Sequence, residues 1–282
     1  SFPTRRSSDL SILGLSTDTQ SLIQQDLAKT TGVILLTGPT GSGKTTTLYT
    51  FLNVLNNPDV KIITLEDPVE YQLDGVNQVQ VNADIGFDFA AGIRSIVRQD
   101  PDIIMVGEIR DAETARIALQ SALTGHLVFS TVHTNDAASA YTRLLDLGVE
   151  EFLLNAALVS VVAQRLARRL CPKCTKPADN AEELLEKYPL QQIADNAGIS
   201  ELTINQAVGC EHCNNSGYKG RIAINEYLRC DDEIKEMPKN DQFIGKAQQH
   251  NYELKRRNLM EDGFYKIVTG VTTIEEVLRV AG

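Results

Sequence analysis

One glycine-rich segment, GPTGSGKT at residues 38–45, constrains this chain more than any other feature. It follows the apolar run 33–37 and precedes a helical pattern over residues 46–55, so the sequence predicts a strand, a loop and a helix in that order. Glycines let backbone amides point inward as a nest for an anion, and the helix N-terminus adds positive potential. The segment predicts a phosphate-binding loop (the P-loop), in preference to a glycine turn with a chance lysine.

The residues expected to bind nucleotide are those of the loop and the start of the helix. Lys44 would bring a positive charge to the β- and γ-phosphates, and the Thr45 hydroxyl would ligate Mg²⁺. The predicted set is Gly38, Pro39, Thr40, Gly41, Ser42, Gly43, Lys44, Thr45 and Thr46. The expected cofactors of this site are therefore ATP and Mg²⁺.

Short and nearly continuous apolar runs recur along the next hundred residues, as expected for parallel strands covered on both faces. The runs are residues 33–37, 62–65, 103–106 and 127–131. A helical pattern separates the last two, with Asp111 as the expected N-cap and Gly125 as the expected end. Its apolar face consists of Ala115, Ala118, Leu119 and Ala122. Strand, helix, strand in this order predicts an α/β fold with a mainly parallel sheet.

An acidic residue, Glu108, follows the run 103–106, where a Walker B element would place one. The carboxyl end of that strand should lie beside the P-loop, where Glu108 would orient or deprotonate the attacking water. Gly107 occupies the position of the usual aspartate, which leaves Thr45 and water as the main expected ligands of Mg²⁺. The alternative for an acid in this place is a helix N-cap.

Other charged residues flank the predicted strands. Glu66, Asp67 and Glu70 follow the run 62–65 and predict either a site for a positive partner, such as Mg²⁺ or a neighbouring subunit's arginine, or a solvated acidic turn. His126 and His133 flank the run 127–131 and have either a structural role or a role in sensing the γ-phosphate. Two arginines one helical turn apart would reach phosphate across a subunit boundary or, as their spacing alone favours, form surface salt bridges; they are Arg94 and Arg98.

Two cysteine pairs of the C-x-x-C type follow residue 170, namely Cys171 with Cys174 and Cys210 with Cys213. Four thiolates make a closed tetrahedral site for Zn²⁺, which we favour over disulfides for thiols expected to stay reduced. The 35 residues between the pairs exceed the usual zinc-ribbon spacing, so we expect an inserted helical segment. Cys230 is left over and should pack as a small apolar residue.

Charge and apolar content exclude some function classes. The formal net charge of −10 argues against a nucleic-acid backbone as main partner. A local basic cluster, Arg165, Arg168 and Arg169, is interpreted as a solvated helix face. The run 156–163 predicts a short buried helix, and no stretch approaches the roughly 18 apolar residues of a membrane span. Residues 1–10, SFPTRRSSDL, resemble a translated sequencing adapter, so we expect a non-native scar and a natural protein that continues upstream.

Over residues 13–280 the chain resembles the secretion ATPase superfamily, in the segments GPTGSGKTT, ITLEDPVEY, RSIVRQDPDIIMVGEIRDAETA and TGHLVFSTVHTNDA. The resemblance implies a RecA-like P-loop ATPase domain in a ring-shaped homo-hexamer, with nucleotide at or near subunit interfaces. It implies that Glu108 is the catalytic base, that Lys44 and Glu66 take part in catalysis, and that His126 and His133 form a histidine box. A glycine before Glu108 is normal in this family.

The four-cysteine module and the segment YKGRIAINEYL (residues 218–228) resemble the branch that drives type II secretion or type IV pilus assembly, not the retraction or conjugation branches. We therefore expect a RecA-like domain at 11–170, a zinc module at 171–229 and a helical tail at 230–282. The family's N-terminal half, whose arginines reach the nucleotide, is absent, so we expect weak hydrolysis by this chain. The resemblance implies a cytoplasmic location, with inner-membrane platform proteins as partners.

Two other function classes compete with the secretion motor. One is a nucleic-acid-dependent RecA-like motor with the cysteines as a zinc ribbon, which the charge of −10 and the lack of interleaved aromatic and basic residues disfavour. The other is a nucleotide-gated scaffold without turnover, which the presence of Lys44, Glu66 and Glu108 disfavours.

Overall fold

A computed structural model describes residues 10–282 of the chain. The scar expected at residues 1–10 lies outside the described residues except for Leu10, the first residue of the short 3₁₀ helix η1 (Leu10–Leu13). The other 3₁₀ helices in the described part are η2 (Ala83–Ile85), η3 (Val97–Gln99) and η4 (Glu211–Cys213).

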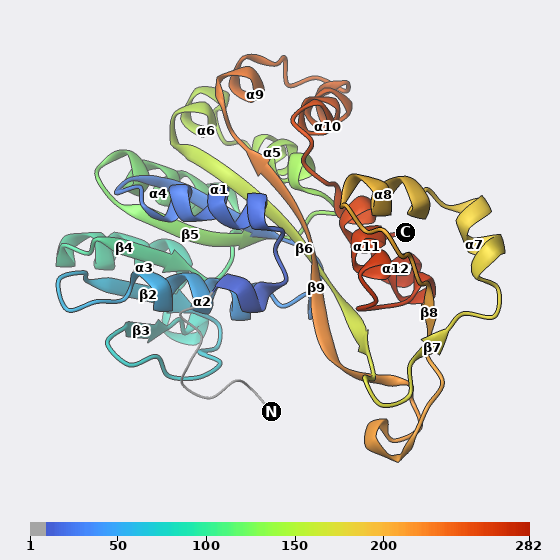
Figure 1. The fold of residues 1–282 in the computed structure, drawn as a ribbon. Coiled ribbons are helices and arrows are strands. Elements are labelled where there is room, and N and C mark those ends of the chain that lie inside the picture. Colours follow the sequence, from blue (N-terminus) through green and yellow to red (C-terminus); the bar gives the residue numbers. More distant parts are fainter. Residues whose placement is uncertain (1–9) are drawn as a thin grey trace.

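A seven-stranded sheet forms the centre of the described part (Figure 1). In sheet order its strands are β3 (Asn77–Gln80), β2 (Ile62–Glu66), β4 (Ile103–Val106), β5 (Leu127–Val132), β1 (Gly32–Thr37), β6 (Leu158–Leu170) and β9 (Tyr218–Arg229). Neighbouring strands are parallel, except that β6 and β9 are antiparallel. This arrangement confirms the predicted α/β fold, and the four predicted apolar runs coincide with β1, β2, β4 and β5.

Helices cover both faces of this sheet, which is why its central strands β1, β2, β4 and β5 are buried along their whole length. One face is covered by α1 (Thr17–Leu27) and α2 (Lys44–Leu55), and the other by α3 (Phe89–Ile96), α4 (Ala112–Leu123), α5 (Ala137–Asp146) and α6 (Glu151–Ala157). Alternate residues of β1 divide between the two cores: Ile34 packs toward α2, and Val33 packs toward α4. Asp111 caps α4 as predicted, since its Oδ1 accepts from the Thr114 amide at 2.8 Å.

The structure corrects one sequence-based element. The predicted buried helix over 156–163 is wrong: α6 ends at Ala157, and the apolar run continues as β6. A strand buried on both faces has the same continuous apolar pattern as a buried helix, and the valines at 159, 161 and 162 favour the strand. Arg165, Arg168 and Arg169 therefore lie on a strand and not on a helix face, and Arg165 is buried.

Strands β6 and β9 form a long antiparallel ribbon (Figure 1). The segment that connects them, residues 171–217, carries the cysteine pairs. The connection contains α7 (Ala181–Lys187), α8 (Leu190–Asn196) and a small two-stranded sheet of β7 (Lys176–Pro177) and β8 (Asn205–Gln206). Strand β9 thus pairs within the large sheet, although the sequence placed it in the 171–229 module.

The chain ends in helices, as predicted. They are α9 (Asp232–Glu236), α10 (Phe243–Glu253), α11 (Leu259–Val268) and α12 (Ile274–Ala281). Helix α12 packs against β6, and α11 packs against β9 and α8. Among the described residues, no helix combines the length and apolar character needed to cross a membrane.

Candidate nucleotide and metal sites

A cleft of about 490 Å³ opens at the carboxyl ends of β1, β2, β4 and β5. Residues 40–46 of the P-loop line one side of it, and the acidic turn after β2 lines another. Glu108, which follows β4, and His133, which follows β5, also line the cleft. The parallel strands therefore bring these separate sequence segments to one edge of the sheet.

The P-loop connects β1 to α2, which begins at Lys44. Gly43 has a left-handed φ of 87°, and Gly38 has a φ of 147°, so both positions favour glycine. A Cβ atom on Gly38 would also lie only 2.4 Å from the Gln164 carbonyl oxygen. The first amides of α2 consequently face the cleft, which is the arrangement that binds anions.

Lys44 is mostly buried, and its Nζ atom donates to the carbonyl oxygens of Gly38 at 2.8 Å and Pro39 at 3.0 Å. Burial lowers the pKa of the Lys44 ammonium; Glu108 counteracts this effect, whereas Arg165 adds to it. Lys44 thus lies at the end of the P-loop, and the negative charge of Glu108 favours the protonated form of its side chain.

Glu108 lies at the end of β4 with two cationic or titratable neighbours. Its carboxylate forms an ion pair with Arg110, and its Oε2 lies 3.6 Å from the His133 Nε2. The hydroxyl of Thr131 donates to the Gly107 carbonyl at 2.8 Å, which fixes the end of β4 against β5. A side chain at Gly107 would begin 3.2 Å from the Leu65 carbonyl oxygen, so little room exists there for the usual aspartate.

The acidic cluster divides into one buried residue and two exposed ones. Glu66 is only 3% exposed and accepts hydrogen bonds from Tyr49, from Thr64 Oγ1 at 2.7 Å and from Gln78 Nε2 at 3.1 Å. Burial raises the pKa of the Tyr49 hydroxyl, and the hydrogen bond to Glu66 adds to this. Asp67 and Glu70 are exposed and line the cleft. The three donors hold the Glu66 carboxylate in place at the end of β2.

The structure does not bring the two histidines together. His133 lines the cleft, but His126 precedes β5, and its Nδ1 lies 2.7 Å from the Ser121 carbonyl oxygen. Six strand residues separate the two positions, which corresponds to about 20 Å at 3.3 Å per residue. Within one chain the two histidines therefore lie at opposite edges of the sheet, and only His133 is placed near the P-loop. The role of both histidines at the nucleotide stays a prediction.

The two arginines before β4 are exposed and do not line the cleft. Arg94 forms an ion pair with Glu113 on α4, as the favoured surface interpretation predicted. Arg98 lies in η3 and is also exposed.

The sequence interpretation missed four residues near the cleft. Arg110 pairs with Glu108, and Arg221 lines the cleft from β9. Gln164 and Arg165, on β6, bond to the P-loop and to the loop after β5, respectively. The sequence does carry a signal for Gln164 and Arg165, because they are polar residues directly after the apolar residues 161–163. If this segment is assigned to a strand, the two side chains must face opposite sides of the sheet.

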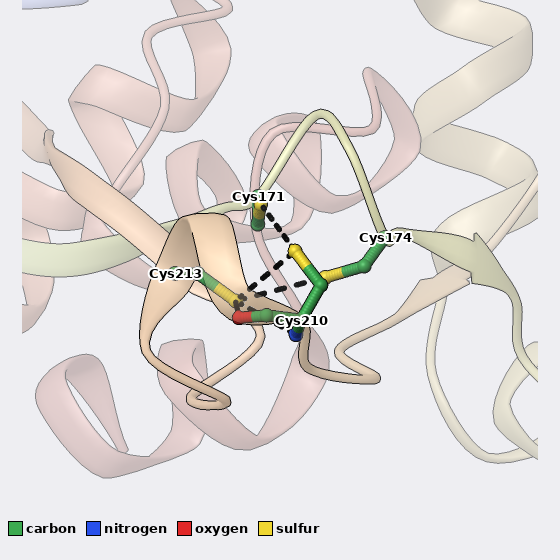
Figure 2. Close-up of side chains that lie close together, drawn as sticks. All are labelled: Cys171, Cys174, Cys210 and Cys213. Carbon is green, nitrogen blue, oxygen red and sulfur yellow. Dashed lines mark hydrogen bonds between the residues drawn. The ribbon is translucent and has the colours of Figure 1, made fainter.

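The four cysteines form a compact cluster where the β6–β9 ribbon ends (Figure 2). Their sulfur atoms all lie within 4.8 Å of one another, and three of the sulfur pairs (Cys171–Cys210, Cys174–Cys213 and Cys210–Cys213) are separated by 3.8 to 3.9 Å. Four sulfurs at 2.3 Å from a tetrahedral ion would be about 3.8 Å apart. Backbone amides donate to the sulfurs: Gly209 to Cys174 at 3.3 Å, and Gly217 to Cys213 at 3.2 Å. The cluster has the donors and spacing of a tetrahedral thiolate site.

The pKa values of a cysteine in the cluster, Cys213, and of Cys230 outside it are shifted in opposite directions. Burial acts to raise the pKa of Cys213, but amide hydrogen bonds from Cys210 and Gly217 overcome it and lower this pKa to about 6. By contrast, burial raises the pKa of Cys230, which lies outside the cluster, to about 12. Cys230 is thus a buried neutral thiol, as predicted.

Known proteins are similar to this chain in sequence and in fold. The family described as "Type II/IV secretion system protein" matches residues 3–279. The type IV pilus assembly ATPase PilB of Myxococcus xanthus is 47% identical over 275 residues, which cover 96% of this chain and 47% of that protein. The type II secretion system protein E of Pseudomonas aeruginosa is also 47% identical over 275 residues, covering 96% of this chain and 53% of that protein. The chain therefore spans about half the length of these relatives.

Two solved structures of ATPases and motors have a similar fold. The pilus retraction motor PilT with bound ADP superimposes with a TM-score of 0.69 at 27% identity, covering 99% of this chain and 68% of PilT. The ATPase DotB of Legionella pneumophila superimposes with a TM-score of 0.67 at 24% identity, covering 96% of this chain and 64% of DotB, and supports the fold. The chain belongs to the type II/IV secretion system protein family.

Proposed function

We propose that this chain is the ATP-hydrolysing part of a motor that powers type II secretion or type IV pilus assembly. The observation that carries the proposal is that Lys44 and Glu108 line one cleft, although 64 positions separate them in the sequence. The relatives at 47% identity are an assembly ATPase and a secretion protein, and the retraction motor is less similar, at 27%.

In the proposed reaction, the P-loop amides and Lys44 would hold the β- and γ-phosphates, and the Thr45 hydroxyl would hold Mg²⁺, which would neutralise part of the phosphate charge. Glu108 orients the attacking water and accepts its proton. Arg110 and His133 lie next to the Glu108 carboxylate and set its orientation. The Glu66 carboxylate, fixed by its three donors, adds negative charge at the neighbouring strand end for Mg²⁺ or its water shell.

The proposal extends to assembly. By analogy with the family, the chain would act in a cytoplasmic homo-hexamer that meets inner-membrane platform proteins. Zn²⁺ would occupy the four-cysteine cluster, where it would hold the ends of the β6–β9 ribbon and the 171–217 connection together.

Glu108→Gln tests the proposed catalytic role. We expect ATP turnover by the purified chain to fall about 100-fold or more, which is the usual contribution of a general base, while the dissociation constant for MgATP changes little. Glu113→Gln is the matched control, because Glu113 is an exposed acid outside the cleft. Turnover that is indifferent to Glu108→Gln would contradict the assignment. Stimulation of turnover by single-stranded DNA would instead favour a nucleic-acid motor.

A further inference from the structure

A buried glutamine on β6, Gln164, forms hydrogen bonds to the P-loop and to the start of α2. Gln164 is 2% exposed, and both ends of its carboxamide have partners. Its Nε2 donates to the Ser42 carbonyl oxygen at 2.7 Å, and its Oε1 accepts from the Thr47 hydroxyl at 2.7 Å. One partner is in the glycine loop, and the other is in the first turn of α2. The carboxamide therefore bridges the two parts of the P-loop whose relative placement creates the anion site.

The contact is close enough to shape the loop. A Cβ atom on Gly43 would lie 2.8 Å from the Gln164 Nε2, and one on Gly38 would lie 2.4 Å from the backbone carbonyl oxygen of Gln164. Two of the loop's glycines are therefore needed not only for their left-handed φ angles but also because the loop packs directly on Gln164. The carboxamide supplies a donor and an acceptor at once in this place, whereas an ionised carboxylate would face the Ser42 carbonyl with a second acceptor.

The next residue along β6 acts on the other side of the sheet. Arg165 donates from its guanidinium to the Asn135 carbonyl oxygen at 2.6 Å, in the loop that begins with His133. Successive strand residues face opposite ways, so consecutive residues of one strand fix the two loops that flank the cleft.

We propose that Gln164 is a positioning residue that presets the P-loop for phosphate, acting through Ser42 and Thr47. The inference rests on the proposed nucleotide-binding function. Without the bridge, the loop would have to be ordered by the ligand itself, and affinity for nucleotide would fall by the cost of that ordering.

Equilibrium binding of MgATP to the full chain tests this inference, with folding monitored by circular dichroism. We expect Gln164→Leu to weaken binding about tenfold or more and Thr47→Val to weaken it less. The double variant should bind no worse than Gln164→Leu alone, because Thr47→Val removes a hydrogen bond that Gln164→Leu has already removed. Ser160→Ala is the control: Ser160 is a buried residue of the same strand whose hydroxyl has no hydrogen-bond partner among residues 10–282, so its loss should leave binding unchanged.

Gln164→Glu separates positioning from mere packing. The carboxyl introduced there keeps the shape of the side chain and bonds like the carboxamide only when it is protonated. We expect the ratio of variant to wild-type affinity to rise as the pH falls from 8 to 6.5, a recovery that a packing defect would not show.

The possible outcomes are distinguishable. If wild-type protein does not bind MgATP, the proposed function fails. If wild-type binds, and folded Gln164→Leu binds within twofold of it, the proposed function survives and the positioning role is overturned. If Gln164→Leu does not fold, Thr47→Val and the pH response of Gln164→Glu decide: normal affinity for the first together with no recovery for the second overturns the inference.

Discussion

At the scale of single residues, Glu276 joins the C-terminal helix α12 to the ribbon. It is 1% exposed and accepts from the Arg168 amide and guanidinium at 2.7 Å and from Arg279 at 2.8 and 2.9 Å. Burial acts to raise its pKa, but the hydrogen bonds from Arg279 and Arg168 overcome burial and lower the pKa to about 2.

This lowered pKa predicts a pH-dependent stability. The unfolded carboxyl has a pKa of about 4.3, so the stabilisation is complete above about pH 5 and is lost as the pH falls toward 2. We expect Glu276→Gln to lower the free energy of unfolding at pH 7 by about 1 to 2 kcal/mol, a value reduced because both arginines are half exposed.

Urea unfolding between pH 7 and pH 4 measures this effect. The difference between wild type and Glu276→Gln should shrink as the pH falls below 5. The control is Glu275→Gln, an exposed neighbour that should change stability little at any pH. A constant difference across this range would mean that Glu276 acts by packing and not by charge.

Single residues differ in how well the sequence predicts their place. Lys44 and Glu108 could be placed in one cleft because each sits at a strand end that parallel topology brings to the same edge. His126 could not, because its apparent partner His133 belongs to the opposite edge. The partners of Gln164 lie more than 115 positions away, so no local pattern indicates them.

At the scale of secondary structure, one carboxylate joins two helices. The buried Glu226 on β9 accepts from the Ala137 amide at 3.0 Å, at the start of α5, and from the Leu259 amide at 3.3 Å, at the start of α11. Arg165 lies near the same carboxylate. Each helix N-terminus leaves amides without helical partners, and Glu226 satisfies one on each.

We expect Glu226→Ala to lower the free energy of unfolding by about 2 to 4 kcal/mol, because it leaves two buried amides without an acceptor and removes one of the two carboxylates that act on Arg165. Glu226→Gln should cost less, since its Oε1 still accepts from one amide. Urea unfolding at pH 7 measures both, with the exposed Glu182→Ala as control. An equal effect of Glu226→Ala and Glu182→Ala would contradict the double-capping role.

The elements themselves show where sequence patterns succeed. Helix α4 was predictable from its Asp111 cap and its apolar face, because these signals are local. Strands β1, β2, β4 and β5 were predictable from their short apolar runs between turns. Strand β6 was not, since its longer apolar run fits a helix equally well, and the choice depends on its pairing with β1 and β9.

At the scale of the whole molecule, the four-cysteine cluster joins the two ends of the long connection between β6 and β9. The 171–217 connection leaves the sheet where β6 ends and returns where β9 begins, and the Cys171 amide donates to the Gly217 carbonyl at 2.9 Å. Without a metal, the short β7–β8 pairing and backbone hydrogen bonds such as that from the Ala178 amide to the Ile204 carbonyl hold the two arms of this connection together against the entropy of closing so long a loop. A metal held by thiolates from both ends would therefore stabilise this region as a cross-link does.

We expect purified protein to contain one Zn²⁺ per chain and Cys210→Ser to lose it, with a fall in the free energy of unfolding of about 4 kcal/mol, as for a cross-link that closes a loop of this length. Cys230→Ala should keep the metal, because Cys230 is a buried thiol outside the cluster. Metal analysis and thermal unfolding, before and after a chelator, measure both variants. Retention of a full equivalent of zinc by Cys210→Ser would show that the cluster is not the metal site. If zinc is lost without any change in stability, the metal does not hold the two ends of the ribbon together.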